Sequence, residues 1–586
     1  MTRPEQVAVW RPVRTAAGPA QVERHIVHIE DILGRKSVAL ALAALLAALY
    51  LIHAGTSSIW DSNEAFYVET PREMMENNTS LYPTFNYKPR LNKPPLAYWL
   101  VIIAYRLMGV SVWSQRLVIA FFALATLVVV WRLAFQLTAS RAAAWAAAGI
   151  IALTPRFFIM GRRSLIDMVL LFFVTAAIYY FHRFVGDRRP LDLVWMSACL
   201  GLGFMGKGPV AIALPALVGA AYLAWRRELP RPPVWAAGLA VGVFAALVLP
   251  WFIGLIRMMS LDSIYNLLVV ESVGRFTVED FGPQRGPFYY LPIFLADFAP
   301  WSLLFVAGVV VWRRHWPELA NQDKSRLVLL LIWFAVPILF FSLSKNKQEY
   351  YILPAYPAAA IALAWLGRRL AGAARPPAWV PWVLRGVFLL GLGIVVLSYV
   401  VGRQILDRHL LLTITLPVMA GLMALGWIWA GGRRWRAALA LPIAGMYVAC
   451  LFLVYEVIPA LEKYRQVPQL AGMINERARP DDYVAYFATA LPSLCYYTRR
   501  PVLELFYDGE IHNFFRRPET IYCLMRKEHL AVLDRAGISY QVLAERPYLS
   551  LRARDLGNMI PAMYTNPLCL VTNQPPESAP STPVLP

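Results

Sequence analysis

Apolar segments of roughly membrane length follow one another along most of this chain, and they limit its fold to a bundle of membrane helices. Fourteen such segments lie between residues 37 and 457 of the 586-residue sequence. The chain is 58% hydrophobic and only 16% charged, which is more apolar sequence than one soluble core can bury. The sequence therefore predicts a polytopic α-helical membrane protein.

Basic residues orient these segments. The formal net charge is +20, and arginines such as Arg226, Arg227 and Arg231 gather in short connections between alternate pairs of segments. Loops of this kind lie on the cytoplasmic side. The basic stretch 1–36 is too long for the start of a signal peptide, and the apolar span after it has no convincing small-residue cleavage site. We therefore expect a cytoplasmic N-terminal segment followed by an uncleaved first helix at 37–54. Topology and contact with membrane lipids explain the positive charge, and no motif indicates nucleic-acid binding.

One early apolar segment cannot cross the membrane if all the basic loops are to lie on the cytoplasmic side. Leu96–Gly109 is the best candidate, because it has about fourteen residues where a span needs roughly 20, and because it carries Arg106. Its Trp and Tyr residues are typical of an interfacial helix. The sequence thus predicts thirteen transmembrane helices, a first outer loop over 56–110 and a C-terminus outside the cytoplasm.

Polar residues become frequent after about residue 460. We expect a membrane catalytic domain over 37–459, a small extracytoplasmic α/β domain over 460–574 and a disordered tail over 575–586. Either one disulfide or three buried thiols fits Cys495, Cys523 and Cys569. The β-rich runs of the predicted domain are Tyr483–Phe487, Leu494–Tyr497, Ile521–Met525, Tyr540–Ala544 and Cys569–Thr572.

Polar residues from five loops fall on the predicted outer side of the membrane. Carboxylates and cations that converge in this way indicate a functional site. The groups are Asp61, Glu64 and Lys93 in the first loop, Arg162 to Asp167, Gly206 to Pro209 around Lys207, Glu271 to Phe276, and Ser342 to Lys347.

Motifs in the same loops resemble one enzyme family. They are Asn63–Tyr67 with Arg72–Met74, Asn92–Trp99, Gly203–Pro209, Pro287–Pro292, and Ser342–Lys345 with Tyr351–Pro354. Together they resemble the lipid-linked-sugar glycosyltransferases, a family that includes the aminoarabinose transferase of lipid A and the protein O-mannosyltransferases. The resemblance covers about residues 37–460. It implies the GT-C fold, an undecaprenyl (polyprenyl) phosphate-linked sugar donor, a lipid or glycan acceptor, and a periplasmic site in the bacterial inner membrane.

The resemblance also implies which cations bind the carrier phosphate. Transfer of a sugar from a phosphate passes through an oxocarbenium-like state and needs a cradle for the departing phosphate, and a hydroxyl acceptor needs a base. The lysine of the Lys-Pro-Pro motif, the lysine of the Gly-Lys-Gly-Pro turn and a later arginine are Lys93, Lys207 and Arg275 here. Snorkelling of these side chains to the membrane interface is the structural alternative.

The catalytic acids are expected among Glu64, Asp61 and Asp167. Many relatives carry an Asp-Glu pair in the first loop, but this chain has Asn63 before Glu64, with Asp61 as the nearest aspartate. Asp61 and Glu64 also fit a capping box, and Asp167 fits a helix N-cap. The matched motifs further place Lys345 and Tyr351 at the substrate pocket.

We expect no cofactor and no tightly bound metal, because the eight histidines lack ligand spacing and Asn92 replaces a glutamate that contacts metal in some relatives; a weak site for a divalent cation stays open. Gly201 to Lys207 imitates a P-loop, but Gly208 follows where a P-loop has Ser or Thr. The sequence predicts a glycosyltransferase with a lipid A-like or other envelope acceptor. A protein O-mannosyltransferase-like enzyme and a transporter or flippase of lipid-linked intermediates are the alternatives.

Overall fold

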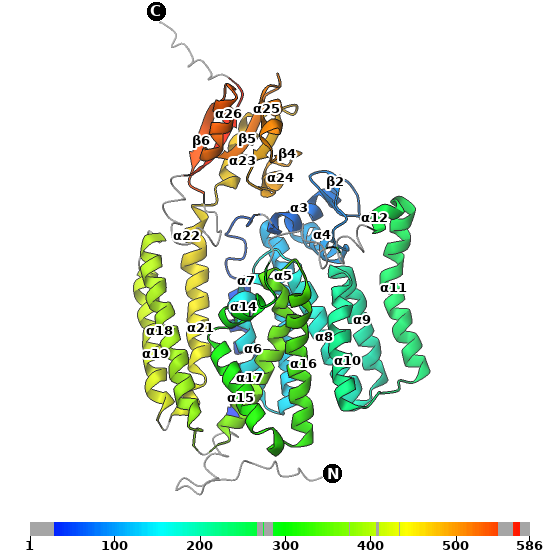
Figure 1. Ribbon diagram of the computed structural model, residues 1–586, viewed down its shortest axis with the longest axis vertical. Helices are drawn as coiled ribbons and strands as arrows, with labels where there is room; N and C mark the ends of the chain where they lie inside the picture. The colour runs from blue at the N-terminus through cyan, green and yellow to red at the C-terminus, as the bar shows by residue number, and fades with distance from the viewer. Residues whose placement is uncertain are drawn as a thin grey trace, which may run out of the picture.

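The computed structural model describes residues 29–61, 63–265, 274, 285–373, 375–405, 410–432, 434–548 and 566–574. Arg275, the predicted tail at 575–586 and most of the predicted N-terminal segment lie outside these residues. The described chain forms a long helical bundle with an α/β domain at one end (Figure 1).

Most helices of the bundle run along its length (Figure 1). Its helices are α2 (Lys36–Leu51), α5 (Val112–Thr138), α6 (Arg141–Ala152), α7 (Pro155–Met160), α8 (Asp167–Asp187), α9 (Pro190–Lys207), α10 (Val210–Arg226), α11 (Val234–Met258), α14 (Tyr290–Asp297), α15 (Trp301–Arg314), α16 (Asn321–Leu343), α17 (Tyr356–Ala371), α18 (Trp379–Ile405), α19 (Leu410–Ala430) and α21 (Leu441–Phe452). Short helices complete it: α12 (Leu261–Tyr265), the 3-10 helix η3 (Glu349–Ala355), α20 (Trp435–Ala438) and α22 (Ile458–Glu462).

Eight helical segments of the described chain are long and apolar enough to cross a membrane, or nine if α14 and α15, which meet at 114°, form one span. Four shorter apolar helices, α2, α4, α6 and α10, accompany them. The prediction of a polytopic helical protein is confirmed, while the count of thirteen stays a prediction. The membrane-length helices are either central or peripheral. In α8, 78% of the most apolar 18-residue stretch is buried, so α8 is central, whereas in α11 only 22% is buried and the helix lies on the periphery.

Local sequence sets the ends of these helices. The side chain of Ser111 accepts a hydrogen bond from the backbone N–H of Ser114 at 3.1 Å and caps α5. Ser140 caps α6 through the N–H of Ala143 in the same way. Gly208 ends α9 with a φ of 85°, a conformation that favours glycine, and Pro209 follows. The predicted turn at Lys207 is therefore the C-terminus of α9.

The first loop lies at the end of the bundle that faces the α/β domain (Figure 1). It contains α3 (Asn63–Glu76), the two-stranded hairpin of β1 (Thr84–Phe85) and β2 (Lys88–Pro89), and α4 (Leu96–Met108). Asp61 and Glu64 do not form the capping box that was the structural alternative to their functional roles. The oxygens of Asp61 accept hydrogen bonds from Ser493 of the α/β domain, and Glu64 accepts one from the backbone N–H of Trp60.

The α/β domain has a five-stranded sheet in the order β4-β3-β5-β7-β6. Strands β4 and β5 run parallel to β3, whereas β7 is antiparallel to β5 and β6. The elements are α23 (Val467–Arg477), β3 (Tyr483–Phe487), α24 (Ser493–Thr498), β4 (Val502–Leu505), α25 (Asp508–Phe515), β5 (Ile521–Arg526), α26 (Leu530–Arg535), β6 (Gln541–Arg546) and β7 (Leu568–Thr572).

One predicted strand of this domain is wrong. Leu494–Tyr497 lies in helix α24, because Asp61 accepts the first backbone N–H of that helix and because Leu494 and Thr498 are buried one turn apart. The strand in this region is β4, a few residues later. Cys495, Cys523 and Cys569 are buried free thiols, which agrees with the thiol alternative.

The place of α4 at the end of the bundle generates a labelling prediction. Met108, which is 43% exposed, and Glu476 of α23 lie on the same side of the membrane if α4 is interfacial. Met108→Cys and Glu476→Cys should both react with an impermeant maleimide added outside intact inner membranes. Arg231→Cys, in the connection between α10 and α11, should react only after permeabilisation. Labelling of Met108→Cys from the cytoplasmic side would show that α4 crosses the membrane.

Candidate active site

The first feature of the site is an ion pair between the ends of two neighbouring helices. Asp167 is the first residue of α8, Lys207 is the last residue of α9, and the two side chains form a salt bridge. Antiparallel packing of α8 and α9 brings these ends together although 40 residues separate them. The dipoles of both helices favour this arrangement, with an acid at an N-terminus and a base at a C-terminus. The pair is poorly accessible, with the side chains 13% and 8% exposed for Lys207 and Asp167.

Aromatic rings flank this pair. The Lys207 Nζ lies 5.3 Å from the ring centre of Tyr351 and 5.8 Å from that of Tyr350, both in η3. A cation held against ring faces remains attracted to them when an anion approaches from another side. The structure thus brings together three residues that the sequence assigned to the site, namely Asp167, Lys207 and Tyr351, and adds Tyr350.

A second charge network surrounds Glu64, which is fully buried. Its oxygens accept hydrogen bonds from the backbone N–H groups of Trp60 at 2.7 Å and Ser164 at 2.6 Å, and from Arg116 Nε and Nη2 at 3.1 and 3.2 Å. Burial by itself raises the pKa of the Glu64 carboxyl, but Arg116 and Arg163 outweigh burial and lower this pKa to about 2. These contacts favour a positioning role for Glu64, and its predicted catalytic role stays a prediction.

Asp61 faces the α/β domain. Its carboxylate accepts a hydrogen bond from the Ser493 backbone N–H at 2.8 Å and another from the Ser493 hydroxyl. Burial is the largest effect on its pKa and raises it to about 7, against the opposing effect of the Ser493 hydrogen bonds. Asp61 therefore joins the first loop to the N-terminus of α24, and its predicted catalytic role also remains a prediction.

Trp60 lies between two arginines. The Arg465 guanidinium is 3.4 Å and the Arg163 guanidinium 4.9 Å from the centre of the Trp60 ring. Arg465 belongs to the segment that leads into the α/β domain, whereas Arg163 belongs to the loop before α8. The Nε of Arg163 is buried without a hydrogen-bond partner, so this arginine retains a donor. Two loops and the domain therefore meet at one aromatic ring.

A third group of charges lies next to η3. Arg285 donates to the Lys347 carbonyl at 3.0 Å and to Glu349 Oε1 at 2.9 Å. Lys347 is buried, its ammonium donates to the Ser344 carbonyl, and burial lowers its pKa. Lys345 is exposed, and Lys93 is half-buried in the turn before α4. The predicted phosphate ligand Arg275 lies outside the described residues.

Sequence reasoning missed Arg116, Arg285 and Tyr350. A signal for Arg116 was present, since an arginine in the second turn of a 27-residue apolar helix needs a buried partner. Arg285 and Tyr350 gave no comparable signal, because they occur among other polar and aromatic residues. The described residues hold no cluster of three or more His, Cys, Asp or Glu side chains that fits a metal ion.

The Glu64 network generates a stability prediction. Glu64→Gln turns one acceptor oxygen into a donor and leaves the buried Arg116 without its counter-charge, so we expect a loss of about 3–5 kcal/mol of unfolding free energy. Thermal unfolding in detergent measures it. Glu76→Gln on the same helix is the control, because its pair with Arg72 is half-exposed and should contribute about 0–1 kcal/mol.

The same network predicts a pH dependence. The folded pKa of Glu64, about 2, lies below the ordinary value of 4.5, so its contribution to stability is present above pH 4.5 and is lost as the pH falls toward 2. The stability difference between wild type and Glu64→Gln should therefore shrink over this range. Equal stability of the two proteins at neutral pH would contradict the positioning role.

Comparisons with known proteins identify relatives of this chain. Residues 92–253 match the model of the family described as dolichyl-phosphate-mannose-protein mannosyltransferase. An undecaprenyl phosphate-alpha-4-amino-4-deoxy-L-arabinose arabinosyl transferase from Erwinia tasmaniensis is 31% identical over 341 residues, which cover 57% of this chain and 60% of that protein. A protein of the same name from Aeromonas salmonicida is 27% identical over 499 residues, or 82% of this chain and 88% of the relative. The chain thus spans about three fifths of the Erwinia relative.

Solved structures give the fold. ArnT from Cupriavidus metallidurans bound to undecaprenyl phosphate superposes with a TM-score of 0.73 at 19% identity, over 93% of this chain and 99% of that one. The same protein in the apo state gives a TM-score of 0.70 with the same coverage. The chain therefore has the fold of ArnT. The sequence matches to the mannosyltransferase model and to the arabinosyl transferases confirm the resemblance to the lipid-linked-sugar glycosyltransferases that its motifs indicated.

Proposed function

We propose that this protein is a membrane glycosyltransferase that moves a sugar from a polyprenyl-phosphate donor to a lipid A-like or other cell-envelope acceptor. The observation that carries the proposal is the Asp167–Lys207 pair beside Tyr350 and Tyr351, at one end of a bundle with the ArnT fold. Two facts about relatives support it: the Cupriavidus metallidurans ArnT holds undecaprenyl phosphate, and the Erwinia and Aeromonas relatives are named arabinosyl transferases.

In the proposed reaction the bond between the anomeric carbon and the phosphate oxygen breaks, and an acceptor hydroxyl forms the new bond to that carbon. The bond electrons leave with the carrier phosphate, which needs positive charge around it. Lys207 supplies this charge, together with Lys93 and Arg275 as the resemblance implies. The proton of the acceptor hydroxyl passes to a carboxylate.

Asp167 is the carboxylate that the geometry favours as base. It shares Lys207 with the incoming phosphate, so carrier binding draws Lys207 away from Asp167 and frees an oxygen to accept a proton. Glu64 has no such opportunity, because its oxygens already accept from Arg116 and two backbone N–H groups. In this proposal Glu64 and Asp61 position the first loop, and Lys345 and Tyr351 border the substrate pocket.

We further infer that thirteen helices cross the membrane, with α2, α6, α9 and α10 crossing in addition to the longer spans and α4 lying at the interface. The basic connection after Arg226 is then cytoplasmic. The site and the α/β domain, which lie at the opposite end of the bundle in Figure 1, are then periplasmic in a bacterial inner membrane.

A protein acceptor is the second candidate. The match of residues 92–253 to the protein mannosyltransferase model favours it, because this segment includes Lys93, Asp167 and Lys207. Incubation of the purified protein with a labelled polyprenyl-phosphate sugar and either lipid A or a Ser/Thr-rich peptide separates the two acceptors. Transfer to neither acceptor, and to no other envelope glycan, would contradict the proposed function.

The affinity for undecaprenyl phosphate tests whether Lys93 and Lys207 bind the carrier phosphate. Lys93→Ala and Lys207→Ala each remove a charge-assisted contact of about 1.5–3 kcal/mol, so both variants should bind undecaprenyl phosphate about 10 to 100 times more weakly. The thermal shift caused by the lipid measures this. Lys88→Ala is the matched control, because Lys88 is an exposed lysine of the same loop. An unchanged lipid response in both variants would remove these lysines from the site.

The rate of sugar transfer tests whether Asp167 is the base. Asp167→Asn keeps a hydrogen-bonding group beside Lys207 but removes the base, so transfer should fall by two or more orders of magnitude while carrier binding persists. Single-turnover transfer and the carrier-induced thermal shift provide the two measurements. Transfer at a near-normal rate would rule out Asp167 as the base and return Glu64 and Asp61 to consideration.

A further inference from the structure

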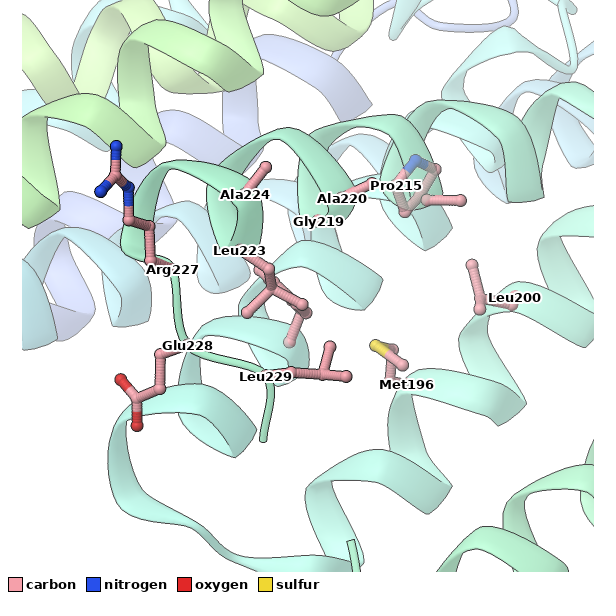
Figure 2. Close-up of a pocket in the computed structure, with 12 residues that line it drawn as sticks. Met196, Leu200, Pro215, Gly219, Ala220, Leu223, Ala224, Arg227, Glu228 and Leu229 are labelled. Carbon is pink, nitrogen blue, oxygen red and sulfur yellow. The ribbon is translucent and has the colours of Figure 1, made fainter. Parts of the chain in front are cut away.

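A groove lies between α9 and α10 in the half of the bundle that is farther from the α/β domain. Its volume is about 680 Å³, within the range of small-molecule sites, and Figure 2 shows its lining side chains. Met196 and Leu200 contribute from α9 and Leu223 from α10. Small residues on α10, among them Ala216 and Ala220, leave the space open. The groove is therefore apolar along most of its length.

This face of the bundle is exposed. Leu229, which lines the groove, is 77% exposed, and the groove residues Ala216, Ala220 and Ala224 are exposed as well. So much apolar surface around a groove is stable only against an apolar partner, and lipid chains surround a helix bundle of this kind. The groove thus opens toward the hydrocarbon of the membrane.

One end of the groove is charged. Arg227 and Glu228 lie there, and Figure 2 shows the Arg227 guanidinium directed away from the leucines. Glu228 already pairs with Arg188 and, at 2.7 Å, with Arg226. Arg227 forms no ion pair with any residue that the structure describes.

The backbone at Arg227 joins the charged and apolar parts. Arg227 ends α10 with a φ of 54°, which reverses the chain and brings Leu229 back against the groove. Figure 2 shows Leu229 between Leu223 and Met196. A cation at the mouth of an apolar groove complements a ligand with one anionic end and a long apolar body.

We propose that this groove binds an anionic diacyl phospholipid. One acyl chain lies along Met196, Leu200 and Leu223, and the headgroup phosphate contacts Arg227. The other end of α9 carries Lys207 of the candidate site, so the bound lipid stabilises the helix that positions this lysine. The proposal does not depend on the reaction that this site performs.

Lipid retention in native mass spectrometry tests the proposal. The full-length protein in detergent, titrated with phosphatidylglycerol, should retain this lipid more strongly than phosphatidylcholine. Arg227→Gln should weaken retention of phosphatidylglycerol about fivefold, which corresponds to one basic residue near an anionic headgroup. Arg231→Gln, at a nearby exposed arginine, should leave retention unchanged. Soluble glycerol phosphate should not compete, because it lacks the acyl chain.

A second pair of variants locates the lipid. Ala220→Phe and Ala216→Phe each fill the groove from α10, and both residues are exposed, so the fold should persist; size-exclusion profiles check this. Either variant should abolish the preference for phosphatidylglycerol. Equal retention of the two phospholipids by wild type, equal loss in Arg227→Gln and Arg231→Gln, or full retention by a folded groove-filling variant would overturn the proposal.

Discussion

The buried pair of Arg116 and Glu64 is the interaction on which the arrangement of the outer loops depends. Arg116 is 1% exposed, and its guanidinium donates to the backbone carbonyls of Ala54, Ser57 and Ser58 as well as to Glu64. Burial of two charges is costly unless each remaining donor and acceptor has a partner. Here the partners are backbone groups of the loop itself, so the charges hold the path of the chain from the end of the first helix to the start of α3.

The α/β domain is tied to this loop at several points, and none of them is a covalent link. Ile59 donates to Tyr497 at 2.9 Å and Asp61 accepts from Ser493, while Ser58 donates at 2.9 Å to Glu462 of α22, which precedes the domain. On the hairpin, Asn86 exchanges two hydrogen bonds with the backbone of Val502. These contacts are short-range and directional, and together they fix how the domain covers the end of the bundle. Ile59 and Asp61 flank Trp60, whose backbone N–H donates to Glu64, so these domain contacts lie next to the Glu64 network.

Part of this arrangement could be predicted from the sequence, and part could not. Runs of apolar residues and the distribution of arginines predict a helical membrane protein, and the order of its polar loops placed Asp167, Lys207 and Tyr351 in one region. The partners of Asp61 and Glu64 could not be predicted, because local patterns suggested a capping box while both carboxylates bind groups up to 432 residues away. The predicted strand at Leu494–Tyr497 is wrong for the same reason, because the distant carboxylate of Asp61 caps that segment as a helix. Local propensity decides an element only where no remote group competes with it.

The Asp167–Lys207 pair also bears on which ligands the site selects. Both side chains are largely removed from solvent, so a ligand that separates them must compensate the ammonium it uncovers. A neutral lipid cannot do this, whereas a phosphate can replace the carboxylate on Lys207 without leaving a buried charge unpaired. Tyr350 and Tyr351 keep the ammonium in place during this exchange, because their rings attract it whichever anion is bound. In the proposed function, the pair that holds Lys207 in place thus also favours an anionic carrier over the neutral lipids that surround it.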